Sequence, residues 1–238
     1  MLESLKEQVY RANMMLVELG LVKFTWGNVS GIDRESGYVA IKPSGVEYAK
    51  LRPEDIVLVD LDANIIEGSL NPSSDTLTHL ELYRGFPEIG GVTHTHSPWA
   101  VSFAQAGCGI PAMGTTHADT FDGTVPCTRK MSKEEIRGEY ERNTGLLLAE
   151  QIRKNGKPAL NVPGALVHSH GPFTWGADAA ESVHNAAVLE LVAEMAYHSM
   201  TIKSVTELGM GAIKIPNPLL RRHFDRKHGD GAYYGQEK

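Results

Sequence analysis

Apolar residues near the start of the chain recur every three or four positions. This spacing places them on one face of a helix, and Gly20 is a natural point for that helix to end. The pattern therefore predicts an amphipathic helix over residues 2–19. The apolar face consists of Leu2, Leu5, Val9, Ala12, Leu16 and Leu19.

The rest of the chain alternates between short apolar runs and longer segments with helical spacing. A capping box, Ser132 with Glu135, and an Asn217–Pro218 start signal mark two of the helices. The polar segment 114–119 shows no helical pattern. Strands are predicted at 38–42, 56–59 and 64–66, at the segment that carries His94 and His96, and at 162–167; helices are predicted at 76–86, from about 97, and at 132–154, 178–200 and 217–228.

Strands and helices interleave, but some connections between strands are too short to hold a crossover helix. Parallel neighbours require such a helix, so we expect a mixed sheet covered by helices rather than an all-parallel one. No linker, low-complexity tract or repeat divides the 238 residues. We therefore predict one domain over residues 1–238.

Two pairs of histidines stand out, His94 with His96 and His168 with His170, each behind an apolar run. Side chains of a strand alternate with a period of two, so each pair would project both imidazoles from one face. Two such strand ends brought together would aim three or four nitrogen ligands at one point, which suits a divalent transition metal. The alternative is that they are ordinary polar residues at strand ends.

Charge and composition argue against several classes of protein. A net charge of -6 with both signs mixed gives no sign of a nucleic-acid surface. The apolar runs are far short of a membrane span, and the N-terminus has no signal-peptide core. Cys108 and Cys127 are too few for a disulfide framework, so we interpret both as structural thiols. We expect a cytoplasmic protein without nucleic-acid or membrane partners.

Three polar turns, two of which contain glycine, could bind an anion. The turns span 25–31, 42–45 and 72–75. Lys42 contributes a cation, and Ser73 and Ser74 lie at a predicted helix N-terminus, where unpaired N–H groups favour negative charge. Together the turns would form a phosphate site; singly, they are ordinary turns and helix caps. Neither a GxGxxG nor a Walker pattern is present, so a nucleotide is not supported.

Several further residues could act on a substrate. Asp75 adjoins the third turn, and Asp119 lies in the polar segment; solvated loop acids are the alternative for both. His223 and Arg226 share a face of the last helix and could meet an anion or simply face solvent. Tyr234 belongs to a glycine-rich tail that contains two adjacent tyrosines, which suggests that the tail docks somewhere.

These motifs, in this order, resemble the class II (metal-dependent) aldolase and epimerase family, and within it the epimerases of pentose phosphates. The similarity spans nearly the whole chain, and its most specific segments are 25–30, 72–76 and 94–97. The resemblance implies a three-layer α/β/α fold with a central mixed, largely antiparallel β-sheet flanked by helices. It also implies a sugar-phosphate substrate and a homotetramer with active sites at subunit interfaces.

The resemblance assigns metal ligands by position. His94, His96 and His170 match the ligands of a divalent metal, commonly Zn²⁺, with Mn²⁺ or Co²⁺ as alternatives. Asp75 stands where the epimerases have an aspartate near or on the metal, and where related aldolases have a glutamate. His168 has no assigned role as a ligand.

The resemblance also assigns the remaining site residues. Asp119 and Tyr234 match the pair that moves protons, supplied across a subunit boundary. Positions contributed by the neighbouring subunit are matched by Thr115, His223 and Arg226. The phosphate and substrate pocket is matched by Gly27, Asn28, Lys42, Ser44, Gly45, Ser73 and Ser74.

The implied reaction inverts C4 of a ketopentose phosphate by breaking and re-forming the C3–C4 bond, with the metal as Lewis acid. One rival is a class II aldolase that releases its fragments, against which Asp75 and Tyr234 argue. Another is a non-catalytic interaction domain on the same fold, which would not need three metal-ligating histidines. A zinc hydrolase lacks support, because no HExxH motif is present.

Overall fold

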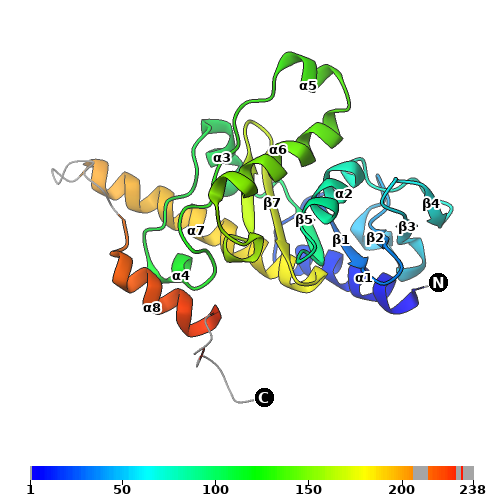
Figure 1. Cartoon of the computed structure of the whole chain (residues 1–238), viewed down its shortest axis with the longest axis horizontal. Coiled ribbons are helices and arrows are strands. Elements are labelled where there is room, and N and C mark those ends of the chain that lie inside the picture. The colour runs from blue at the N-terminus through cyan, green and yellow to red at the C-terminus, as the bar shows by residue number, and fades with distance from the viewer. Residues whose placement is uncertain (1, 206–213, 229–231, 233–238) are drawn as a thin grey trace.

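The computed structural model describes residues 2–205, 214–228 and 232. Helices and strands alternate along these residues (Figure 1). The strands are β1 (Asn28–Asp33), β2 (Tyr38–Ile41), β3 (Val57–Val59), β4 (Ile65–Glu67), β5 (Gly91–His94), β6 (Gly164–Val167) and β7 (Gly171–Gly176). The α-helices are α1 (Glu3–Glu18), α2 (Thr76–Gly85), α3 (Pro98–Ala106), α4 (Thr115–Ala118), α5 (Lys133–Arg137), α6 (Tyr140–Asn155), α7 (Ala179–Val205) and α8 (Asn217–His228), and the short 3-10 helices are η1 (Tyr48–Lys50), η2 (Pro53–Asp55) and η3 (Ala159–Asn161).

The strands form one sheet in the order β4-β3-β2-β1-β5-β7-β6. All pairings between these strands are antiparallel, and Cys127 adds one parallel bridge to Leu166 of β6. The expected, largely antiparallel sheet is thus confirmed, and the parallel contact is an isolated bridge rather than a pair of strands. In the centre, Asn28 of β1 lies opposite His94 of β5, which lies opposite Phe173 of β7.

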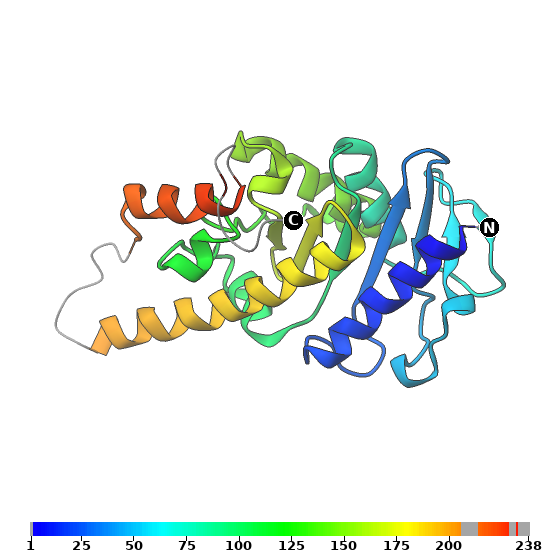
Figure 2. The same ribbon diagram turned by 90° about the horizontal axis from the view of Figure 1, so that it is seen from below.

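Helices cover both faces of the sheet. On one face, α1 and α7 lie along the strands (Figure 2), and Val9, Leu16 and Val183 pack with Val29 of β1. On the other face, α2 and α6 pack against β5 and β7. Burying one such aliphatic side chain contributes about 1.5–3 kcal/mol, so the two apolar clusters hold the three layers together.

The far half of α7 extends beyond the sheet. The middle of α7 packs with α3 and β6 around Phe103, Leu166 and Leu189. A smaller cluster that includes Ala118 and Leu220 joins α4 to α8. None of the helices among the described residues is both long and apolar enough to cross a membrane.

Most predicted elements are confirmed within a few residues, three predictions are corrected, and two strands were missed. Strands β1 and β7 were not predicted. The helix predicted at 132–154 is two helices, α5 and α6, because the chain breaks at Gly138. The segment 114–119 contains the short helix α4. Helix α7 continues beyond residue 200 to Val205.

Candidate active site

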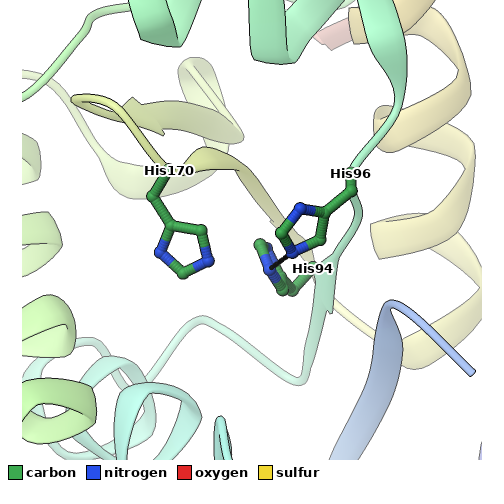
Figure 3. A group of neighbouring side chains, drawn as sticks. All are labelled: His94, His96 and His170. Atoms are coloured by element: carbon green, nitrogen blue, oxygen red, sulfur yellow. Dashed lines mark hydrogen bonds between the residues drawn. The ribbon is translucent and has the colours of Figure 1, made fainter.

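Three histidines converge where β5 and the β6–β7 turn meet (Figure 3). His94 ends β5, His96 follows two residues later, and His170 lies in the turn. One ring nitrogen of each residue lies within 4.8 Å of those of the other two. Three imidazole nitrogens gathered in this way could hold a single metal ion.

The surrounding backbone orients His94. Its Nδ1 lies 2.9 Å from the Pro172 carbonyl, which can only accept, so Nδ1 carries the proton and Nε2 has the free lone pair. Phe173 stacks on the ring at a centroid distance of 4.1 Å. Nε2 lies 3.1 Å from Nε2 of His96, so without a cation the two nitrogens must share a proton. The donor set therefore fits a divalent metal.

Burial keeps the site in its metal-binding form. Loss of solvent, with His94 close by, lowers the pKa of His170 to about 4 and also lowers the pKa of His96. Both rings are then neutral at pH 7, and a neutral imidazole is the form that coordinates a metal.

We expected the second histidine pair to project from one face of a strand, and this prediction was wrong. His168, Ser169 and His170 form the turn between β6 and β7, and Ser169 is left-handed with φ 63°. His168 instead packs against Gly107, where an added Cβ would lie 2.5 Å from its Nε2. Only one member of the pair therefore joins the metal group.

Asp75 lies beside the histidines but outside the three-residue group. It occupies the N-cap position of α2, and Asn28 Nδ2 donates to its Oδ2 at 2.7 Å. Burial opposes ionisation of this carboxyl, but nearby His94, then His79, and the Asn28 hydrogen bond together lower its pKa. Asp75 is thus an anion held at the edge of the site.

The phosphate turns and the histidines line one cavity of about 410 Å³. Two backbone hydrogen bonds join the turns: Ser44 N donates to Asn71 O at 2.9 Å, and Ser73 N donates to Lys42 O at 3.0 Å. Predicted pocket residues that line the cavity are Gly27, Asn28, Lys42, Ser44, Gly45, Ser73 and Ser74, together with Asp75, His94, His96 and His170. The structure thus brings together residues from five separate segments of the sequence.

Lys42 is the predicted cation of this cavity and is almost fully buried. Its Nζ donates to Val46 O at 2.8 Å and lies 4.8 Å from the centre of the Tyr48 ring. Burial lowers the pKa of Lys42 to about 8. Its charge is therefore sensitive to mildly alkaline pH.

Asp119 belongs to a separate cluster between α4 and α8. Its carboxylate is 2.8 Å from Arg226 Nη2 and 3.0 Å from His223 Nδ1, and Thr115 begins the same short helix. Burial opposes ionisation, but hydrogen bonds from Arg226 and His223 outweigh it and lower the Asp119 pKa. These four residues are not among those that line the cavity of their own chain. Tyr234 lies outside the described residues.

Two residues at the start of α6 were missed by the sequence analysis. Tyr140 and Glu141 line the cavity, and the Tyr140 hydroxyl lies 3.3 Å from His170 Nδ1. We placed both inside one long helix, where a tyrosine and a glutamate carry no special signal. The Gly138 break was the available clue, because it makes Tyr140 the first residue of a new helix.

A family model describes most of this chain. The model of the Class II Aldolase and Adducin N-terminal domain matches residues 7–197. The chain belongs to this family. Class II aldolases are metal-dependent, and the three-histidine group of this chain could hold a metal ion.

Solved structures show the same fold at low sequence identity. An L-fuculose 1-phosphate aldolase is 22% identical with a TM-score of 0.76, covering 94% of this chain and 95% of its own. The YgbL protein of Escherichia coli is 22% identical with a TM-score of 0.68, covering 92% and 97%. An L-fuculose-1-phosphate aldolase from Thermus thermophilus is 24% identical with a TM-score of 0.66, covering 84% and 96%. The class II aldolase fold of the chain is therefore shown.

Proposed function

We propose that this protein is an L-ribulose-5-phosphate 4-epimerase, which interconverts L-ribulose 5-phosphate and D-xylulose 5-phosphate. The observation that carries the proposal is the single cavity lined by both the three histidines and the phosphate turns. Inversion at C4 needs cleavage of the C3–C4 bond, because the C4 hydrogen is not adjacent to the carbonyl. A divalent metal held by the histidines, Zn²⁺ in our proposal, supplies Lewis-acid stabilisation of charge on the sugar oxygens.

The phosphate turns have a specific task in this reaction. Cleavage leaves the phosphate on the aldehyde fragment, which must rotate and present its other face before the bond re-forms. The hydroxyls of Ser44, Ser73 and Ser74 and the Lys42 ammonium are the groups that retain this fragment. Retention distinguishes an epimerase from an aldolase.

One proton must be removed from the C4 hydroxyl and one returned to it on opposite faces of the aldehyde, since the hydroxyl leaves one face and returns on the other. We assign this exchange to Asp119 and Tyr234. Because Asp119 does not line its own chain's cavity, the proposal requires a second copy of the chain to bring the Asp119 cluster to the site. Thr115, His223 and Arg226 would arrive with it, in the homotetramer that the family resemblance implies.

A class II sugar-phosphate aldolase is the second candidate, because it needs the same metal and phosphate groups. We favour the epimerase because Asp75 stands where the aldolases have a glutamate. Its side chain is shorter than that of a glutamate, and its carboxylate accepts a hydrogen bond from Asn28. A non-catalytic interaction domain is disfavoured by the three converging histidines.

The proposal is tested by offering the metal-loaded protein L-ribulose 5-phosphate and L-fuculose 1-phosphate in parallel. Conversion of the first to D-xylulose 5-phosphate, with little cleavage of the second, supports an epimerase. Faster cleavage of the second, with free aldehyde and dihydroxyacetone phosphate as products, supports the aldolase.

A further inference from the structure

Polar side chains join α2 to β1 along a line that leads from the core to the candidate metal site. Asn28 and Ser30 lie two residues apart on β1 and therefore face the same side. Asp75, His79 and Tyr83 lie four residues apart along α2 and share one face. Asn28 bonds Asp75, and Ser30 Oγ lies 2.7 Å from both His79 Nδ1 and Tyr83 Oη.

Hydrogen-bond accounting along this line fixes the tautomer of His79. If Tyr83 donates to Ser30 and Ser30 donates to His79 Nδ1, both hydroxyl protons are used and the ring proton is on Nε2. If His79 Nδ1 donates instead, one hydroxyl proton is left without an acceptor and the Nε2 lone pair is left without a donor, whereas the first arrangement leaves only the Nε2–H unpaired. Each unpaired buried polar atom costs about 1–3 kcal/mol. The first arrangement is therefore favoured.

The remaining Nε2–H is a buried donor close to Asp75. His79 is fully buried, and its Nε2 has no hydrogen-bond partner among the described residues. Burial lowers the pKa of His79 to about 3, against the opposing effect of the nearby Asp75 carboxylate, so the ring is neutral. A neutral N–H is thus left in the field of the Asp75 anion.

His79 also supports the ring behind the first metal-site histidine. It meets Phe173 edge-on at a centroid distance of 6.1 Å, and Phe173 stacks on His94. One buried side chain therefore contacts the ring that supports His94 and also lies near the Asp75 carboxylate.

We propose that His79 is a positioning residue for the metal site, which presents an Nε2–H dipole to Asp75 in a tautomer imposed by Ser30 and Tyr83. The inference rests on the proposed place of Asp75 beside the metal. It predicts that the donor at Nε2, rather than the bulk of the ring, sets the position of Asp75 and hence the strength of metal binding.

Two amide variants of His79 distinguish the role of Nε2 from that of Nδ1. In His79→Gln the amide reaches the place of Nε2, whereas in His79→Asn it reaches only the place of Nδ1. Zn²⁺ binding to metal-stripped protein is measured by calorimetry. We expect His79→Asn to weaken binding by about tenfold or more, the usual effect of losing a partner behind a ligand, and His79→Gln to stay within about threefold of the parent. Equal losses in the two variants, or no loss in either, would overturn the proposal.

A double-mutant comparison tests whether the effect passes through Asp75. If it does, His79→Asn changes Zn²⁺ affinity far less in an Asp75→Asn background than in the parent. An undiminished effect would contradict the proposed route. Both readouts are independent of turnover, so absence of epimerase activity with this pattern intact would refute the proposed function and leave the inference standing.

The tautomer is tested directly in the unaltered protein. Nitrogen NMR of ¹⁵N-histidine-labelled protein should show one neutral imidazole with the proton on Nε2 between pH 6 and 8, and this signal should be missing from His79→Gln. If His79→Asn does not fold, Ser30→Ala replaces it, with loss of the fixed tautomer as the expected result. A proton on Nδ1, or a charged ring, would overturn the proposal.

Discussion

His94 Nε2 lies 3.1 Å from His96 Nε2, although His94 ends a strand and His96 lies beyond it. Side chains two residues apart on an extended chain point to the same side, which lets the two rings meet. The third ring, His170, reaches them from the turn between β6 and β7. The candidate metal centre is thus built from residues at the ends of strands, at one edge of the sheet.

The two histidines of the β6–β7 turn should differ in their effect on metal. His170→Ala removes one of three nitrogens and should lower bound Zn²⁺ to a small fraction of the parent, measured by elemental analysis after equilibration with the metal. His168→Ala is the matched control, because His168 packs on Gly107 rather than on the other rings. Equal metal content in the two variants would rule out the assigned ligand set.

Gly27 should be needed for the shape of the cavity, since it has φ 78° and an added Cβ would lie 2.9 Å from the His94 carbonyl oxygen. Gly27→Ala should lose stability and also weaken Zn²⁺ binding, because the clash displaces the His94 backbone. Gly37→Ala is the control: its φ is 75° with nothing within 4 Å, so only the left-handed strain of about 1–2 kcal/mol applies. Chemical denaturation and calorimetry check both. Unchanged Zn²⁺ affinity in Gly27→Ala would refute this account.

Turnover should depend on pH through Lys42. Burial lowers its pKa to about 8, so the ammonium is charged below that pH and neutral above it. A sugar phosphate has a second pKa of about 6 and is already a dianion there, so kcat/KM should fall above pH 8 as the cation is lost. Lys42→Arg stays charged to about pH 12 and should remove this decline. A decline that persists unchanged in Lys42→Arg would show that another group causes it.

Helix α8 should be anchored by Asp122. This carboxylate, 8% exposed, is 3.0 Å from Lys157 Nζ and also pairs with Arg221 of α8. Breaking a buried pair costs about 3–5 kcal/mol, but Lys157 and Arg221 are about 40% exposed, so Asp122→Ala should cost about 1–3 kcal/mol in urea denaturation. Asp225→Ala, at an exposed position of the same helix, should change stability by less than about 0.5 kcal/mol. Equal unfolding midpoints for the two variants would argue against the anchor.

The outer elements were predictable from sequence, whereas two central strands were not. Predicted strands alternate or run apolar, and helix α1 carries a continuous apolar face. By contrast, β1 buries Asn28 and Ser30 against α2, and Thr174 of β7 donates to Ser182 O. A strand whose buried positions are polar resembles a turn in the sequence, because the partners that satisfy those groups come from distant segments.

Much of the candidate site was also predictable from local sequence motifs, but residues whose place depends on packing between distant segments were not. Motifs with strict residue types, such as the phosphate turns and the histidine pairs, identified most of the cavity lining. Tyr140 escaped because its role depends on a helix break, and His79 because one buried histidine on a helix carries no pattern of its own. The distance of Asp119 from the cavity of its own chain also depends on packing that no local motif records.

The central claim, that C4 is inverted by cleavage and re-formation of the C3–C4 bond with both fragments retained, is tested by one NMR measurement. The metal-loaded protein is given L-ribulose 5-phosphate in D₂O, and the products are followed over time. We predict D-xylulose 5-phosphate that carries hydrogen, not deuterium, at C4, because the C4–H bond never breaks. Deuterium at C4, or free glycolaldehyde phosphate and dihydroxyacetone as the main products, would contradict the account.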